Sequence, residues 1–209
     1  MHPEWLAGKT LVLAGPGRAG RAFARSWRAA GGRIAAVVTR SEAAAGDPAL
    51  SGASLVSWTE GAALPDSDVI ALAVSDDAIA DAAARLAPRS RARLAYHFSG
   101  ALSSALLSPF ASGPGRASVA SLHPVRPFTG STDEDWSGAF VAVEGQEDAS
   151  GEGEEILRAL GARPYRIAAE NRTVPADFDS SCEAAAVRDA APPMWKVRIV
   201  SCVPGSPID

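Results

Sequence analysis

One short stretch of the sequence has the glycine spacing of a phosphate-binding loop. It reads Gly15-Pro16-Gly17-Arg18-Ala19-Gly20. An apolar run before it, Thr10–Ala14, predicts a buried strand, and the three- and four-residue spacing of apolar residues over Arg18–Ala30 predicts a helix. The first glycine would permit a tight turn, the second a close approach to a pyrophosphate, and the third close packing of helix on strand. A turn that merely needs glycines is the alternative, but strand, loop and helix together predict a dinucleotide-binding loop at a helix N-terminus.

The end of the next predicted strand, Arg33–Thr39, indicates which dinucleotide the loop takes. NAD-binding proteins usually place an acid there, about 20 residues beyond the loop, to bind the adenosine ribose. Here the strand is followed by Arg40 and Ser41, and Glu42 comes later. Arg40 could form two hydrogen bonds with a 2′-phosphate, and the hydroxyls of Thr39 and Ser41 could add donors. The pattern favours NADP over NAD, with a solvated surface arginine as the alternative.

Polar residues follow further predicted strands, at the ends where an open parallel sheet binds its ligand. After Asp68–Val74, the backbone of Val74 and Ser75 could contact the ribose or nicotinamide of the cofactor. The acids that come next, Asp76 and Asp77, could cap the following helix or have a functional role.

The strand Arg93–His97 is followed by Ser99 and Gly100. A hydroxyl and an N–H at these positions could hold a substrate oxygen, or the residues could form an ordinary turn. His97 is a further candidate substrate-binding residue, although it could simply close a core strand.

His123 is a candidate for proton transfer. It follows the apolar strand Ser118–Leu122 and precedes Pro124, which would hold it at the mouth of the strand. An imidazole there could exchange a proton with a substrate hydroxyl while hydride moves to or from the nicotinamide. A structural histidine bonded to a loop is the alternative. We predict His123 and Ser99 as the catalytic residues.

The composition excludes several other classes of protein. The 209 residues suit one α/β domain with at most a small appendage. The net charge of −4 argues against a nucleic-acid partner. The two cysteines, Cys182 and Cys202, lie in no CxxC or Cys/His cluster, so neither a metal site nor a disulfide framework is expected. The sequence has no secretory signal and no apolar run of the roughly 18–20 residues that span a bilayer, so a cytoplasmic location without a membrane partner is expected.

The predicted elements define an α/β fold. Strands and helices beyond those already named are expected at six places: Leu55–Ser57, Ala78–Leu86, Ser103–Leu107, Phe140–Glu144, Glu152–Leu160 and Tyr165–Ile167. Their alternation implies a Rossmann-type, doubly wound and mainly parallel sheet with helices on both faces. Residues 8–170 form the predicted dinucleotide-binding domain. Residues 171–209, which are rich in proline, are expected to form an irregular and partly disordered tail, a remnant of or replacement for a helical dimerisation domain.

Whole segments of the sequence also resemble those of known proteins. Four carry the resemblance: GPGRAGRAFARSWRAAGG, DVIALAVSDDAI, YHFSGALSSALL and SLHPVRPF. They resemble a family of Rossmann-like oxidoreductases with a conserved C-terminal domain of unknown function. More distantly, they are similar to pyrroline-5-carboxylate reductase, the 6-phosphogluconate and β-hydroxyacid dehydrogenases, and prephenate dehydrogenase. The resemblance covers about residues 8–170.

The resemblance implies NAD(P) as cofactor, a small-molecule substrate, and a following helical domain that completes the substrate site and forms a homodimer. It implies that the glycine loop surrounds the pyrophosphate and that Arg40 binds the 2′-phosphate. It places Val74 and Ser75 on the nicotinamide side, and it turns Ser99, Gly100 and His123 toward the substrate. The His-Pro pair is similar to the histidine of prephenate dehydrogenases that contacts the substrate hydroxyl.

After residue 170 the sequence departs from that family. Members continue with a Tyr-His-Ala-Ala-Ala-like segment and several long helices, whereas here only Cys182–Val187 is similar, and the sequence ends at Asp209. We expect most of the helical domain to be missing, through truncation or a change of reading frame. Two functions stay open: an NADP-dependent oxidoreductase acting on a hydroxy-, keto- or imino-compound, which truncation could inactivate, and a non-catalytic NADP(H)-binding sensor. An S-adenosylmethionine methyltransferase is disfavoured, because it would need an acid where Arg40 stands.

Overall fold

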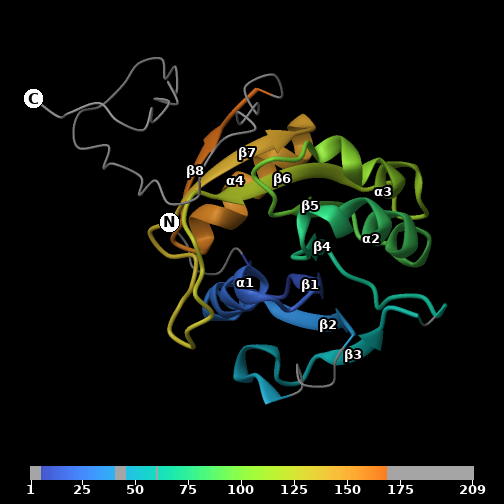
Figure 1. Ribbon diagram of the computed structural model, residues 1–209, viewed down its shortest axis with the longest axis horizontal. Coiled ribbons are helices and arrows are strands. Elements are labelled where there is room, and N and C mark those ends of the chain that lie inside the picture. Colours follow the sequence, from blue (N-terminus) through green and yellow to red (C-terminus); the bar gives the residue numbers. More distant parts are fainter. Residues whose placement is uncertain (1–5, 41–45, 60, 169–209) are drawn as a thin grey trace, which may run out of the picture. The chain divides into compact units, whose positions relative to one another are not determined.

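The computed structural model describes residues 6–40, 46–59 and 61–168. The strands and helices are, in chain order, β1 (Thr10–Ala14), α1 (Arg18–Ala29), β2 (Arg33–Thr39), β3 (Ser54–Ser57), β4 (Val69–Leu72), α2 (Ile79–Leu86), β5 (Leu94–His97), α3 (Ser108–Ser112), β6 (Ser118–Pro124), β7 (Phe140–Gly145), α4 (Glu147–Ala159) and β8 (Arg163–Arg166) (Figure 1). The tail expected over residues 171–209 lies outside the described residues, so the predicted division of the chain stays a prediction.

The strands of the described part form a single sheet in the order β3-β2-β1-β4-β5-β6-β7-β8. From β3 to β6 all neighbours are parallel. β7 pairs antiparallel with β6, and β8 pairs parallel with β7. The order 3-2-1-4-5-6 of the parallel part is that of doubly wound dinucleotide-binding sheets. The predicted Rossmann-type fold with a mainly parallel sheet is therefore confirmed.

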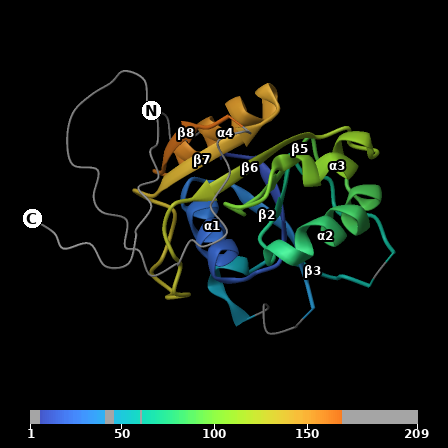
Figure 2. The same ribbon diagram turned by 45° about the horizontal axis from the view of Figure 1, so that its top comes forward.

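Two apolar cores cover the two faces of the sheet. α1 and α4 pack on one face, where Phe23 and Trp27 of α1 are fully buried. α2 and α3 pack on the other face (Figures 1 and 2). Central strands that are covered on both faces have no polar side, which is why every residue of β4 is buried. This arrangement leaves the C-terminal ends of the parallel strands at one edge of the sheet.

Two elements are longer than the sequence predicts. α4 begins at Glu147, five residues before the expected start at Glu152. Glycines at 151 and 153 weaken the helical pattern, but Gly153 faces the sheet closely, since a Cβ there would lie 3.0 Å from Leu122 Cδ2. β6 continues through His123 to Pro124, because the antiparallel partner β7 extends its pairing. The sequence suggests that His123 follows the strand, but in the structure His123 lies within it.

The start of α2 also differs from prediction. Asp76 and Asp77 form a 3₁₀ turn, Asp76–Ala78, ahead of the helix. Within this described segment neither the turn nor the helix has a side-chain cap hydrogen bond, so the expected capping by one of these acids is wrong. Their carboxylates lie in the first turn, where the helix dipole favours negative charge.

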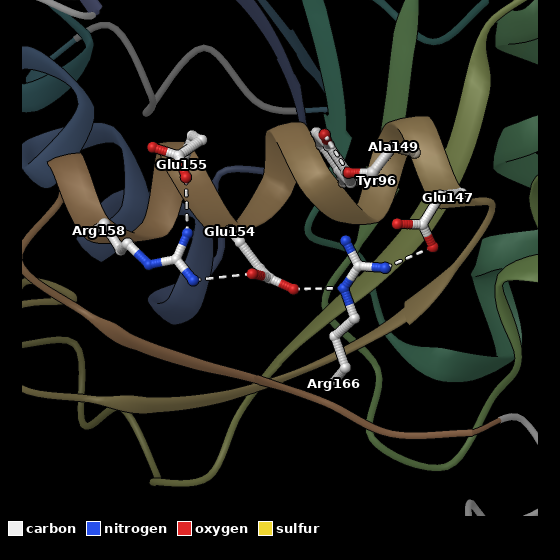
Figure 3. Close-up of polar contacts among 7 residues, drawn as sticks. All are labelled: Tyr96, Glu147, Ala149, Glu154, Glu155, Arg158 and Arg166. Carbon is white, nitrogen blue, oxygen red and sulfur yellow. Dashed lines mark hydrogen bonds and ion pairs between the residues drawn. The ribbon is translucent and has the colours of Figure 1, made fainter.

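Charged side chains join α4 to the last strand (Figure 3). Arg166 of β8 pairs with Glu147 and Glu154, and Glu154 also accepts from Arg158 at 2.8 Å. Burial raises the pKa of Glu154, but the hydrogen bonds from Arg166 and Arg158 outweigh it and hold that pKa below its usual value. On the inner side of α4, the Tyr96 hydroxyl donates to Ala149 O at 2.9 Å. α4 is thus fixed both to the sheet and to its edge strand.

Among the described residues, no helix combines the length and the apolar character that crossing a membrane requires. Nor do these residues contain three or more His, Cys, Asp or Glu side chains grouped as metal ligands would be.

Candidate functional site: the carboxyl edge of the sheet

The glycine loop lies between the ends of β2 and β4. Gly15 N–H donates to Val38 O at 3.0 Å, and Ala73 N–H donates to Ala14 O at 2.8 Å. Gly15 has a φ of +83°, and a Cβ there would lie 2.7 Å from Val74 Cγ1 and 2.8 Å from Ala73 O. Both the backbone conformation and the close approach of Ala73 and Val74 require glycine at this position.

The other two glycines differ in their surroundings. A Cβ at Gly20 would lie 2.7 Å from Gly15 O and 2.8 Å from Ala73 Cβ, so this glycine allows α1 to approach the end of β4. Gly17 is exposed, and of the non-adjacent described atoms only Ala73 O would come within 4 Å of a Cβ, at 3.6 Å. The surface over Gly17 is open. A cradle that is packed on the inside and open on the outside fits a pyrophosphate group.

The first turn of α1 offers N–H groups to an anion. The N-cap is Gly17, without a side-chain cap hydrogen bond, and the first turn of this helix contains no acid. The first intrahelical bond runs from Arg21 N–H to Gly17 O at 2.9 Å. The N–H groups of Arg18, Ala19 and Gly20 precede that bond and point out of the helix end. Together with the helix dipole they form a phosphate-binding surface.

At the adenosine end, Thr39 is the last residue of β2 and is half-buried, and Arg40 follows it and is exposed. Ser41 and Glu42 lie outside the described residues. Arg40 has the exposure that contact with a phosphate needs.

The next acid in the described chain, Asp47, is engaged elsewhere. Its Oδ1 accepts from Ala49 N–H at 2.8 Å, and its Oδ2 lies 3.4 Å from Arg21 Nε. Arg21 in turn donates to Pro16 O of the glycine loop at 2.8 Å. The carboxylate of Asp47 thus caps a 3₁₀ turn and pairs with α1. Sequence reasoning missed Arg21, which supports the loop from the fourth position of the helix.

β4 ends at Leu72, two residues before the predicted end at Val74, so both Val74 and Ser75 follow the strand, and they are half-buried and exposed, respectively. The Val74 side chain lies against Gly15. Ser75 begins the 3₁₀ turn that leads into α2. Both residues therefore lie beside the glycine loop at the carboxyl edge.

At the end of β5, His97 is fully buried. Its Nδ1 accepts from Ser99 N–H at 3.2 Å, and its Nε2 lies 3.2 Å from Ser103 O. Ser99 is 7% exposed, and its Oγ accepts from Ala101 N–H and Leu102 N–H at 3.2 and 3.1 Å. This geometry makes His97 a residue that shapes the turn after β5. Its predicted contact with substrate has no support in its position, because its ring is buried.

His123 and Gly100 are in contact. A Cβ at Gly100 would lie 2.4, 2.5 and 2.8 Å from Cε1, Nε2 and Nδ1 of the His123 ring. The imidazole therefore lies flat against the Gly100 backbone. His123 and Gly100 are both half-buried, so part of the pair is exposed to solvent. The fold thus brings two of the predicted site residues together from different strand ends.

A loop between β6 and β7 packs against α1. Trp136 is fully buried, its N–H donates to Ser26 Oγ at 2.7 Å, and its indole Nε1–H donates to Ala19 O at 3.3 Å. Its ring lies 5.0 Å from that of Phe23 and 4.8 Å from that of Phe98. The sequence does not reveal the role of Trp136, because the residues of α1 that it contacts lie more than 100 positions earlier in the chain.

No protein-family model matches the chain, and neither does any curated protein. Solved structures do resemble it. A protein from Bacteroides fragilis described as an NADP oxidoreductase aligns with a TM-score of 0.64 and 18% identity, over 78% of this chain and 62% of that one. Prephenate dehydrogenase from A. aeolicus, in complex with hydroxyphenyl propionate and NAD+, aligns with a TM-score of 0.64 and 14% identity, over 80% and 63%. Pyrroline carboxylate reductase from Plasmodium falciparum, with NADP bound, aligns with a TM-score of 0.55 and 15% identity, over 78% and 58%.

These likenesses show the fold. The chain has the Rossmann-type NAD(P)-binding fold that occurs in dehydrogenases and reductases of known structure. It spans about three fifths of the length of those structures.

Proposed function

We propose that this chain binds a nicotinamide dinucleotide at the glycine loop and acts as an oxidoreductase on a small hydroxy-, keto- or imino-compound. The observation that carries the proposal is the arrangement of the three glycines. Gly15 and Gly20 are packed against the segment that directly follows β4, whereas Gly17 faces open surface beside the N–H groups of α1. The solved structures that share the fold include proteins with NADP or NAD+ bound.

We propose NADP as the preferred cofactor. Arg40 is exposed directly after β2, where a 2′-phosphate would lie. Asp47 bonds to Ala49 and Arg21, so its carboxylate is not placed as a ligand for ribose hydroxyls.

When bound, the cofactor supplies or takes up a hydride. The proposed role of His123 is to give or take the proton at an imidazole nitrogen, while Gly100 holds the ring in place from one side. The Ser99 hydroxyl accepts hydrogen bonds from two backbone N–H groups and so stabilises the turn that follows β5. We therefore propose His123 as the residue that contacts substrate, and Ser99 as one that orders its surroundings.

A non-catalytic NADP(H)-binding sensor is the second candidate. The chain spans only about three fifths of the similar structures, and part of a substrate site in those proteins could lie in the remainder. A homodimer and a cytoplasmic location stay predictions of the sequence.

Fluorescence titration with NADPH and NADH tests the cofactor. We expect NADPH to bind more tightly, and Arg40→Ala to weaken NADPH about 10- to 100-fold, the usual effect of losing a charge-assisted hydrogen bond, while NADH changes little. Arg33→Ala, at the opposite end of β2, is the matched control. Equal affinities for the two cofactors would reject the role of Arg40. Oxidation of NADPH with a panel of carbonyl and imine compounds then separates enzyme from sensor, since a sensor binds tightly without turnover.

A further inference from the structure

Three polar residues lie side by side on adjacent strands. The register pairs His97 of β5 with Ser121 of β6, and Ser121 with Glu144 of β7. Paired residues point to the same face of a sheet. The three side chains, here called the polar row, are 0%, 0% and 7% exposed. Buried polar groups need hydrogen-bond partners, and all three have partners in one segment, residues 99–104, here called the 99–104 turn.

The beginning of the 99–104 turn is held by two members of the polar row. Ser99 N–H donates to His97 Nδ1 at 3.2 Å, and Ser121 Oγ donates to Ser99 O at 3.1 Å. Both backbone groups of Ser99 are thus bonded to neighbouring strands.

The other end of the 99–104 turn is held by the third member. Glu144 accepts from Ser104 N–H at 2.9 Å and from Ser104 Oγ at 2.8 Å. The His97 Nε2 lies 3.2 Å from Ser103 O. Because Nδ1 of His97 accepts a hydrogen bond, its proton lies on Nε2, which then donates to Ser103 O.

Between these two fixed ends lies Gly100, against which the His123 ring is packed. Of the eight buried polar or charged residues in the described part of the chain, five belong to the polar row and its partners Ser99 and Ser104. Apolar side chains would fill the same space without burying a carboxylate. A fully bonded network instead favours one position of the turn over others.

We propose that His97, Ser121 and Glu144 are positioning residues: the polar row fixes the 99–104 turn so that Gly100 forms the surface against which His123 rests. The inference rests on the proposed function in that His123 transfers the proton. The placement of His123 itself can be tested without cofactor or substrate.

The test uses NMR of the histidine rings in the full chain. The sequence contains only three histidines, so His2→Gln and His123→Gln assign all the ring signals. We expect His97 to carry its proton on Nε2 at neutral pH. Ser104→Ala removes one bond to Glu144 and should move the His123 ring signals. Ser104→Thr keeps a hydroxyl for Glu144 and should restore them.

Ser103→Ala is the matched control, because among the described residues the Ser103 hydroxyl has one hydrogen bond, a local one accepted from Ala105 N–H. It should leave the His123 signals in place, whereas Gly100→Ala should move them most. If Ser104→Ala does not fold, Ser121→Ala replaces it. A proton on Nδ1 of His97 would overturn the proposal, as would His123 signals that move as much in Ser103→Ala as in Ser104→Ala. NADPH titration of the same samples tests the proposed function separately. If the His123 signals move in Ser104→Ala but NADPH does not bind, the proposed function is rejected and the positioning role of the polar row is kept.

Discussion

Gly15 and Val74 touch across the ends of β1 and β4, so closely that a Cβ on Gly15 would lie 2.7 Å from Val74 Cγ1. We expect Gly15→Ala to lower stability through two effects: about 1–2 kcal/mol for the left-handed conformation and about 1–3 kcal/mol for the clash. It should also abolish NADPH binding. Gly52 has a φ of +74° with nothing within 4 Å of its Cβ position, so Gly52→Ala is the control with backbone strain alone. Urea unfolding and NADPH titration measure both variants, and equal losses of stability would contradict the close contact.

His123→Asn should separate binding from chemistry. Since the His123 ring lies at the end of β6 and the glycine loop at the end of β1, the affinity for NADPH should stay within about twofold. We expect kcat/KM to fall about 10²- to 10⁴-fold with any substrate found in the carbonyl and imine panel, the usual contribution of a general acid or base. Steady-state kinetics gives the result. A variant with full activity would remove His123 from the reaction.

Asp68 should contribute to stability in a pH-dependent way. Burial raises its pKa, but hydrogen bonds from the Thr10 N–H and hydroxyl, at 2.8 and 3.0 Å, outweigh it and leave the pKa of Asp68 below its ordinary value. A carboxyl with a lowered pKa in the folded state stabilises above its unfolded pKa of about 3.9, and that stabilisation is lost as the pH falls through the folded value. Asp68→Asn should cost about 1–2 kcal/mol at pH 7 and less at pH 3.

Urea unfolding at the two pH values measures this difference. Asp66→Asn, at an exposed position two residues earlier, should change the free energy of unfolding by less than about 0.5 kcal/mol. A loss for Asp68→Asn that is the same at both pH values would speak against the ionised carboxylate as its source.

Tyr96 should limit stability at alkaline pH. Burial raises the pKa of its hydroxyl above the ordinary value, and the hydroxyl donates to Ala149 O at 2.9 Å. The unfolded chain loses this proton above about pH 10, whereas the folded chain keeps it, so stability falls as the pH rises beyond that point. Tyr96→Phe should cost about 1 kcal/mol at pH 7 and flatten the alkaline fall.

Thermal melts between pH 8 and 11 show this effect. Tyr165, whose pKa burial also raises, has a half-buried ring on the edge strand β8, so Tyr165→Phe should flatten the curve less. A steeper alkaline fall in Tyr96→Phe would contradict the assignment.

Much of the fold is predictable because its signals are local. Thr10–Ala14 is an apolar run that ends at the glycine loop, and Arg33–Thr39 is one that begins after Gly31 and Gly32. Both form the strands expected, with the helix between them. Gly31, with a φ of +87°, ends that helix as predicted, and its N–H donates to Arg28 O at 2.9 Å.

The extended end of β6 was not predictable from local pattern. Pro124 suggests that the strand stops earlier, but Pro124 pairs with Val141 and Val125 N–H donates to Phe140 O at 2.8 Å. That pairing depends on a partner some fifteen residues later.

The candidate site was predictable where one segment contains its whole signal, as in Gly15–Gly20. It was not predictable where distant segments combine. Ser121 and Glu144 look like ordinary strand residues in the sequence, and their common orientation toward the 99–104 turn depends on the register of three strands. For His97 the sequence leaves open both substrate contact and a place in the core, because the burial of its ring depends on the packing of that turn.

Trp136 connects two parts of the candidate site that come from distant segments of the chain: α1 and the loop that follows β6. Its indole donates to Ala19 O in the first turn of α1, and its backbone N–H donates to Ser26 Oγ, while its own loop continues from the strand that carries His123. A ligand that tightens the first turn of α1 would therefore act on the loop beside His123 as well. Thermodynamic linkage requires such an effect to be reciprocal: whatever cofactor binding does for substrate affinity, substrate does for cofactor affinity by the same factor.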